Sequence, residues 1–198
     1  MPGTGRLPCV EILLARHGET EWSASGRHTG RTDVPLTDQG REQARALGPR
    51  LAGRDLDVVL SSPLQRARES CELAGFGEQA LLRDDLMEWD YGAYEGLTTP
   101  QIREREPGWM VWTHPIVDGE TVEQLGVRID RVISELAGAS GDCAVFAHGH
   151  VLRVLGARWL GLAPADGALL ALDTATLSVL GYEHERRVVR LWNDGSHL

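Results

Sequence analysis

The alternation of short apolar runs with amphipathic segments is the feature that most constrains the fold of this chain. The predicted strands, each nearly continuous in apolar residues, are 9–15, 56–62 and 142–148. The predicted helices, with apolar side chains at helical spacing, are 36–53, 63–75, 119–138 and 149–161. Because apolar runs of this length are typical of buried strands, the alternation predicts a parallel sheet covered by helices.

The pattern as a whole predicts an α/β fold, a three-layer sandwich with a mostly parallel central sheet and helices on both faces. A hairpin predicted around 184–186 adds an antiparallel edge at the C-terminal end. Residues 76–118 are irregular and rich in tryptophan, and we interpret them as an insertion over the rim of the sheet. The length of 198 residues fits one domain, 1–198.

The charge of the chain restricts its partners. A net charge of −9 argues against binding to nucleic acid or to an anionic membrane surface. All 20 basic residues are arginine, so no lysine can form a Schiff base or hold a phosphate. An anionic substrate must therefore be held by arginine, histidine, backbone N–H groups or a metal.

The remaining composition favours a soluble protein of the cytoplasm. Cys9, Cys71 and Cys143 are scattered and odd in number, which predicts neither a disulfide framework nor a cysteine metal site. The N-terminal stretch lacks the pattern of a signal peptide, and no apolar run is long enough to cross a bilayer. His148 and His150 are spaced i, i+2 across a predicted turn, which favours no metal site, and we expect no cofactor.

Polar residues follow three of the predicted strands. Arg16 and His17 come after the first strand, Arg66 follows the second, and His148 ends the third. Because the carboxyl ends of parallel strands meet at one edge, we expect these side chains to lie together. Arginine binds phosphate oxygens through paired donors, and a neutral imidazole can attack phosphorus. Gly18 is expected to leave room for the phosphate and to offer its backbone N–H.

A phosphate-transfer site of this kind also needs an acid that protonates the leaving oxygen. Glu88 lies in the irregular segment, and the aromatic residues that follow it would favour its protonated form. Other carboxylates that compete for the role are Asp84, Asp85, Asp90 and Glu95. The tryptophans of this segment (Trp89, Trp109 and Trp112) are interpreted as packing residues and not as a platform for a base.

Four stretches together resemble a known family. They are "LLARHGETEWSASGRHTGRTDVPLTDQGREQA", "SSPLQRARES", "LMEWDYGAYEG" and "AVFAHGH", in that order. These are similar to the motifs of the histidine phosphatase superfamily, the phosphoglycerate mutase-like proteins, and in character to its small broad-specificity acid phosphatases. The resemblance spans most of the chain and implies the phosphoglycerate mutase-like version of the fold.

The resemblance assigns roles residue by residue. It implies His17 as the phosphorylated nucleophile and Glu88 as the proton donor. Arg16, Arg66 and His148 would complete the phosphate pocket. The family loop that approaches the substrate matches Thr29 and Gly30 in "HTGRTD", and Ser23 stands where the family usually has asparagine.

Three functions remain open at this point. The first is a metal-independent phosphomonoesterase that acts on small phosphorylated metabolites through a phosphohistidine. The second is a phosphoglycerate mutase, which is disfavoured because the irregular segment is short and its only arginines after Glu88 are Arg103 and Arg105. The third is a member of the family that binds a phosphorylated ligand or a protein without turnover. The sequence also leaves open whether the protein forms a homodimer.

Overall fold

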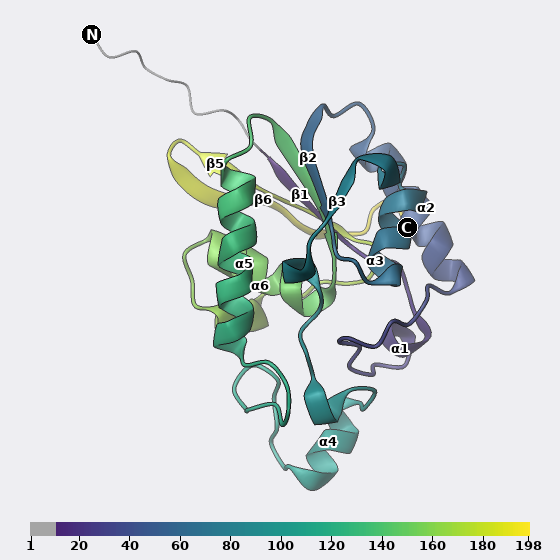
Figure 1. Cartoon of the computed structure of the whole chain (residues 1–198), viewed down its shortest axis with the longest axis vertical. Helices are drawn as coiled ribbons and strands as arrows, with labels where there is room; N and C mark the ends of the chain where they lie inside the picture. Colours follow the sequence, from purple (N-terminus) through teal and green to yellow (C-terminus); the bar gives the residue numbers. More distant parts are fainter. Residues whose placement is uncertain (1–10) are drawn as a thin grey trace.

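A computed structural model describes residues 11–198, and its centre is a six-stranded sheet with the strand order β3-β2-β4-β1-β5-β6 (Figure 1). The strands are β1 (Ile12–Arg16), β2 (Leu56–Ser61), β3 (Ala80–Leu82), β4 (Asp142–Ala147), β5 (Leu177–Glu183) and β6 (Arg186–Asp194). β1, β2, β3 and β4 pair in parallel, whereas β5 is antiparallel both to β1 and to β6. The predicted mostly parallel sheet with an antiparallel C-terminal edge is confirmed. Positions 9 and 10 of the first predicted strand lie outside the described residues.

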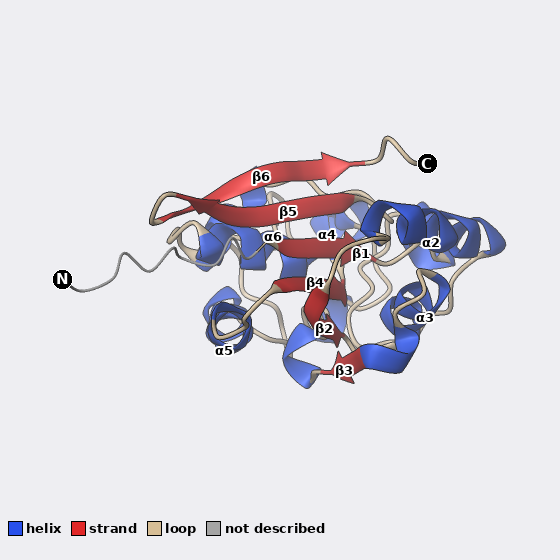
Figure 2. Ribbon diagram, turned by 90° about the horizontal axis from the view of Figure 1, so that it is seen from above, coloured by secondary structure: helices blue, strands red, loops and turns tan. Residues whose placement is uncertain are grey.

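Helices cover both faces of this sheet (Figure 2). The α-helices are α1 (Glu21–Ala24), α2 (Asp38–Leu51), α3 (Gln65–Leu73), α4 (Thr99–Arg105), α5 (Val122–Ala137) and α6 (Gly149–Trp159). The short 3-10 helices are η1 (Gly77–Gln79), η2 (Asp84–Leu86), η3 (Gly92–Tyr94) and η4 (Pro164–Leu169). One face packs against α2 and α3 and the other against α5 and α6, which is the predicted three-layer arrangement.

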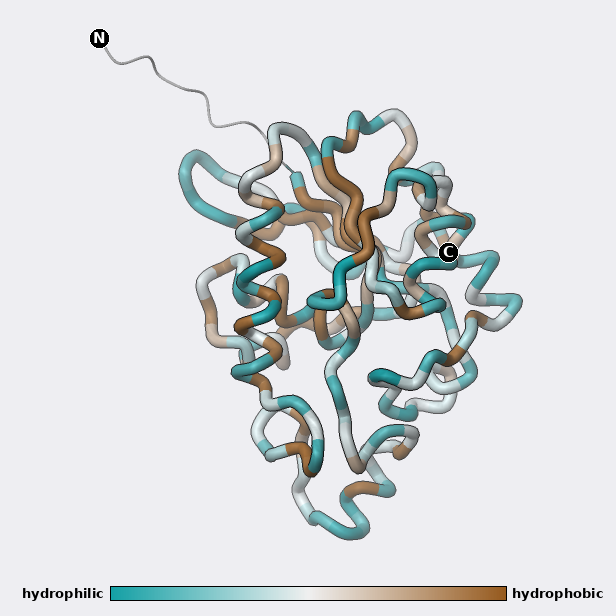
Figure 3. Tube along the Cα trace, in the orientation of Figure 1, coloured by the Kyte–Doolittle hydropathy of each residue, from teal (hydrophilic) through white to brown (hydrophobic). Residues whose placement is uncertain are grey.

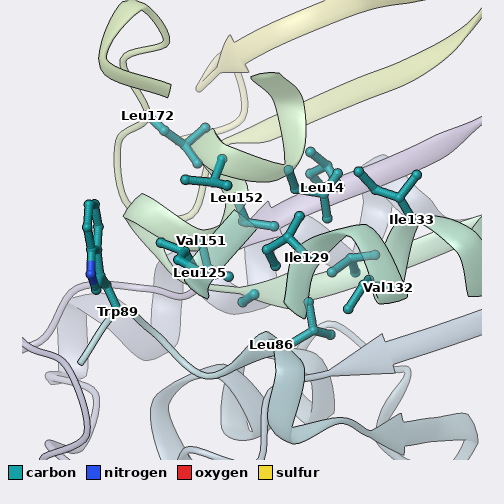
Figure 4. Close-up of a cluster of buried hydrophobic side chains, with 14 of the residues drawn as sticks. Leu14, Leu86, Trp89, Leu125, Ile129, Val132, Ile133, Val151, Leu152 and Leu172 are labelled. Carbon is teal, nitrogen blue, oxygen red and sulfur yellow. The ribbon is translucent and has the colours of Figure 1, made fainter. Parts of the chain in front are cut away.

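Alternation along the strands explains the two cores. On β1, Ile12 and Leu14 pack toward α5 and α6, whereas Leu13 and Ala15 pack toward α2 and α3. In the hydropathy trace, apolar residues are concentrated along the central strands (Figure 3). The close-up in Figure 4 shows the larger core, in which side chains from α5 and α6 interdigitate. Since successive side chains of a strand point to opposite faces, a nearly continuous apolar run is required here.

Threonine residues fix the beginnings of the two longest helices. Thr37 accepts a hydrogen bond from the Gly40 N–H at the start of α2. Thr121 accepts one from the Gln124 N–H, and the Gln124 side chain bonds back to the Thr121 N–H, so that α5 begins with a complete capping box. These caps stop the chain from extending each helix into the preceding loop.

Three elements differ from the sequence-based expectation. Residues 80–82 belong to the sheet, where β3 pairs with β2, so the irregular segment begins later than residue 76. Helix α3 begins at Gln65, two residues after Pro63, because the backbone at Leu64 is still extended. Helix α4 was not expected, and a capping box at Thr98 and Gln101 stabilises it. In Figure 1, α1 and α4 both lie beyond the same end of the sheet.

Candidate active site

A cavity of about 190 Å³ lies beyond the carboxyl ends of the parallel strands. Its lining residues are Arg16, His17, Ser23, Gly26, Arg27, His28, Thr29, Glu88, Tyr91, Gly149, His150, Arg153 and Leu172. These residues come from the end of β1, helix α1 and the turn after it, the irregular segment, the start of α6 and the loop before β5. Ligand sites of open α/β sheets occupy this position.

His17 presents a reactive nitrogen to the cavity. Its Nδ1–H donates to the Gly18 carbonyl at 2.7 Å, which leaves the lone pair on Nε2. Burial lowers the pKa of His17 well below its ordinary value, and the positive charges of Arg66 and Arg16 lower it further. The ring is therefore neutral near pH 7 and its Nε2 is free to act as a nucleophile.

Arg16 lies beside His17 and keeps part of its guanidinium group unbonded. Nη1 donates to the Leu172 carbonyl at 2.5 Å, whereas the buried Nε has no partner among the described residues. A Cβ atom on Gly149 would lie 3.4 Å from the Arg16 Cζ, so the guanidinium packs directly against the start of α6. A buried donor without a partner is costly, and an anion in the cavity would satisfy it.

Arg66 and His148 are close to His17 but do not line the cavity. The Arg66 Nε donates to His148 Nδ1 at 3.1 Å, and its Nη groups donate to carbonyls of the 29–32 loop. His148 Nε2 in turn donates to Ser62 Oγ at 2.8 Å. The His148 and His17 rings are 5.2 Å apart, and burial together with the charge of Arg66 lowers the pKa of His148 well below its ordinary value. The structure brings both predicted residues close to His17, although neither lines the cavity.

Glu88 is held in the cavity by three backbone N–H groups. Oε1 accepts from Trp89 and Val151, and Oε2 accepts from His150. The last two donors belong to the first turn of α6, where the free N–H groups of the helix favour an acidic side chain. Since Oε2 accepts only one of these bonds, it is the oxygen with room for a proton.

Three of the four competing carboxylates are engaged elsewhere. Asp85 pairs with Arg131 and Asp90 accepts from the Gly92 N–H. Glu95 accepts from the N–H groups of Gly30 and Thr32 and so fixes the loop that also binds Arg66. Glu88 is the one carboxylate among the lining residues.

Of the three predicted substrate-binding residues, the structure brings two to the cavity. Ser23 and Thr29 line it, although the Ser23 hydroxyl donates to the Thr20 carbonyl and the Thr29 hydroxyl to the Arg27 carbonyl. Gly30 does not line the cavity. A Cβ there would meet the Trp89 carbonyl at 2.5 Å, so close packing explains the glycine.

Gly18 also differs from expectation. Its N–H donates to Ser70 Oγ at 3.1 Å and is not offered to the cavity. A Cβ on Gly18 would lie 2.1 Å from the Gly40 carbonyl oxygen, and a Cβ on Gly40 would lie 2.1 Å from the Glu19 carbonyl oxygen. The glycine is therefore required because the loop after His17 presses against the first turn of α2.

Eight lining residues have no catalytic or substrate-binding role assigned from the sequence: Gly26, Arg27, His28, Tyr91, Gly149, His150, Arg153 and Leu172. The sequence favours His28 and His150 as residues in or beside the pocket wall, and both line the cavity. The Tyr91 hydroxyl donates to His150 Nδ1 at 2.6 Å, since burial raises the pKa of Tyr91 well above its ordinary value and keeps the phenol protonated. Burial also lowers the pKa of His28 to about 4. The signal for His150 in the sequence is its position two residues after His148, at the start of the predicted helix 149–161 and therefore at the same strand end.

Comparison with known proteins agrees with this geometry. The family model of the histidine phosphatase superfamily (branch 1) matches residues 12–195. The chain belongs to the histidine phosphatase superfamily.

Relatives within the histidine phosphatase superfamily include several phosphatases. An acid phosphatase of Mycobacterium tuberculosis is 46% identical over 177 residues, 87% of each chain. A sedoheptulose 1,7-bisphosphatase of Saccharomyces cerevisiae is 36% identical, over 76% of this chain and 67% of its own. A solved structure from Mycobacterium tuberculosis has a TM-score of 0.86 at 43% identity and covers 93% of this chain and 97% of that one. These similarities support the resemblance first indicated by the motifs.

Within residues 11–198, no helix is both long and apolar enough to cross a bilayer.

Proposed function

We propose that this protein hydrolyses small phosphomonoesters, with His17 as the nucleophile and Glu88 as the general acid and base. The observation that carries the assignment is the neutral His17 ring, whose Nδ1–H is bound to a carbonyl while Nε2 borders the cavity. The unpartnered Nε of Arg16 beside it supports a phosphoryl group as the occupant. A cavity of about 190 Å³ is smaller than the ~300–1,000 Å³ typical of drug-sized ligands, which favours a small metabolite.

The first step forms a phosphoenzyme. His17 Nε2 attacks phosphorus, the bond from phosphorus to the ester oxygen breaks, and the leaving oxygen takes the proton from Glu88. Arg16 binds the phosphoryl oxygens, and Arg66 acts from behind through His148 and the 29–32 loop. A fixed positive charge of this kind stabilises the charge that develops in the transition state.

The second step returns the enzyme to its starting state. A water molecule attacks phosphorus and gives a proton to the Glu88 carboxylate, while the bond between phosphorus and Nε2 breaks. Inorganic phosphate leaves, and His17 is again a neutral imidazole. Phosphorus–nitrogen bonds hydrolyse readily, so the histidine splits one difficult displacement into two easier ones.

Rapid-quench measurements with a 32P-labelled phosphomonoester test this proposal. We expect a phosphoenzyme that is labile in acid and stable in base, and its loss in His17→Asn. His184→Asn, at an exposed turn position, is the matched control and should retain both phosphoenzyme and turnover. An acid-stable adduct, undiminished turnover in His17→Asn or loss of activity with chelators would contradict the mechanism.

Phosphoglycerate mutase remains the second candidate, because two further cations, Arg27 and Arg153, line the cavity. Arg27 and Arg153 lie outside residues 76–118. In the sequence, the features that disfavour a mutase belong to that segment alone. A mutase returns the phosphoryl group to the bound product, so release of phosphate from 3-phosphoglycerate would be slow beside its conversion to 2-phosphoglycerate. We expect phosphate release to dominate.

A further inference from the structure

The cavity holds more positive charge than one phosphoryl group neutralises. Arg16, Arg27 and Arg153 line it, Arg66 lies behind it, and Glu88 is its one lining carboxylate. A phosphate monoester carries roughly two negative charges near pH 7. With that ester bound and Glu88 protonated, as the first step requires, one of the three positive charges that line the cavity is still unbalanced by a lining group.

These four arginines differ from many others in the chain. Within residues 11–198 none of the four forms an ion pair with a carboxylate. The arginines that do are Arg41, Arg50, Arg54, Arg68, Arg83, Arg128, Arg131 and Arg158. Carboxylates are abundant in a chain of net charge −9. Arginines that nevertheless form no ion pair and lie at a cavity are suited to bind an anionic ligand.

Arg153 is held in place without losing its charge to a partner. Its Nε donates to the Gly167 carbonyl at 3.1 Å, Nη2 to the Ala168 carbonyl at 3.3 Å, and its Cζ lies 4.6 Å from the centre of the Trp112 ring. The remaining Nη1 donates no hydrogen bond to any described residue. A guanidinium fixed by two carbonyls and an indole face is preorganised to bind an anion.

The position of Arg153 sets its separation from the reacting phosphorus. Arg16 packs against Gly149, and Arg153 follows Gly149 by four residues in the same helix. Four residues of α-helix rise about 6 Å, so Arg153 lies roughly one turn further along the cavity wall. Arg27 comes from the turn after α1, and its exposed side chain makes no hydrogen bond within residues 11–198.

We propose that Arg153, assisted by Arg27, forms a subsite for a second anionic group of the substrate. The enzyme then selects short phosphomonoesters that carry a carboxylate or a second phosphoryl group about one helical turn, ~6 Å, from the reacting phosphorus. This inference rests on the proposed function for the reaction itself, but it concerns binding and is testable without turnover.

Titration calorimetry with three phosphonates, which cannot be hydrolysed, tests the subsite. Propylphosphonate has one anionic group, 3-phosphonopropionate adds a carboxylate, and 1,3-propylenediphosphonate adds a second phosphonate. We expect the wild-type protein to bind at least one of the latter two about tenfold more tightly than propylphosphonate. In Arg153→Met this preference should fall below about threefold, and Arg153→Lys should restore part of it.

The control is Arg45→Met, which removes an exposed arginine of α2 and should keep the full preference. Arg27→Met should reduce the preference less than Arg153→Met does. A preference for the carboxylate or for the diphosphonate supports the subsite and identifies which group it takes. Equal binding of all three ligands by the wild type, or equal weakening of all three in Arg153→Met, would overturn the proposal. Either result is independent of whether His17 forms a phosphoenzyme.

Discussion

The floor of the cavity and its mouth are built in opposite ways. We define the floor as His17 together with its neighbours Arg66 and His148, which do not themselves line the cavity, and the mouth as Arg27 and Arg153. The floor residues are at most 4% exposed, and hydrogen bonds from strand ends and loops hold them. The mouth residues are partly or fully open to solvent, and neither meets a carboxylate within the described chain. The difference indicates that the floor is complete before substrate binds, whereas the mouth is completed by the substrate.

Removal of Arg66 should have the largest effect, because the whole floor depends on it. Arg66→Met leaves His148 and three carbonyls of the 29–32 loop without a donor. We expect kcat to fall by about 10³ or more, and the free energy of unfolding to fall by roughly 2–4 kcal/mol. Urea denaturation and steady-state kinetics measure the two effects. A variant with lost activity and full stability would show that Arg66 contacts substrate and does not build the floor.

Arg128 on α5 links the acid-bearing segment to the rest of the molecule. Its Nη1 donates to the carbonyls of Asp85 and Met87, and its Nη2 to that of Glu88. Arg128→Met should lower kcat by about 10- to 100-fold with little change in KM, because Glu88 is misplaced while the phosphate site persists. Arg45→Met, which removes an exposed arginine of α2, is the control and should retain kcat. A rise in KM alone would instead mean that the substitution disturbs substrate binding at the mouth and not the position of Glu88.

The buried histidines should make the fold weaker in acid. Burial lowers the pKa of His28 from 6.5 to about 4, and the pKa values of His17, His148 and His150 shift in the same direction. Below pH 6.5 the unfolded chain therefore binds protons that the folded chain does not, and the free energy of unfolding falls as the pH falls from 6.5 toward 4.

Urea midpoints at pH 7.5 and pH 5 measure this loss. His28→Gln removes one of the titrating groups and should show a smaller drop than the wild type, whereas His184→Asn should show the full drop. A midpoint that does not change between the two pH values would mean that these histidines take up protons in the folded protein as readily as in the unfolded chain.

The smallest effect is expected where the floor and the mouth meet. Tyr91→Phe removes the hydrogen bond from the Tyr91 hydroxyl to His150 and leaves the aromatic packing intact. We expect a loss of about 1 kcal/mol in the free energy of unfolding and a change in kcat/KM of severalfold. Thermal unfolding and kinetics with one substrate are sufficient to measure both. A large loss of kcat with normal stability would assign the hydroxyl to the chemistry.

Much of the floor was predictable from the sequence because its residues directly follow apolar runs. The ends of β1, β2 and β4 meet at one edge for topological reasons, so the order of apolar and polar segments is enough to place His17 and His148 together. The edge strand β3 was not predictable, since three residues with no local signal pair with β2 through a contact between distant segments.

The mouth was missed for a different reason. Arg153 resembles any charged residue on the surface of an amphipathic helix, and Arg27 resembles any polar residue in a turn. Their significance depends on the cavity that α6 and the turn after α1 line together, and on the absence of an ion pair between either arginine and a carboxylate of the described chain. Neither property can be read along the sequence, because both depend on which elements become neighbours.

The two glycines that face each other, Gly18 and Gly40, also limit how this protein can evolve. A Cβ atom on Gly18 would clash with the Gly40 carbonyl, and a Cβ atom on Gly40 would clash with the Glu19 carbonyl. Because both clashes are with the backbone, no shorter side chain elsewhere can relieve them. Substitutions at the first turn of α2 are therefore as restricted as those beside the nucleophile. In a directed-evolution library, diversity is better placed at the mouth, where Arg27 and Arg153 can change without moving His17.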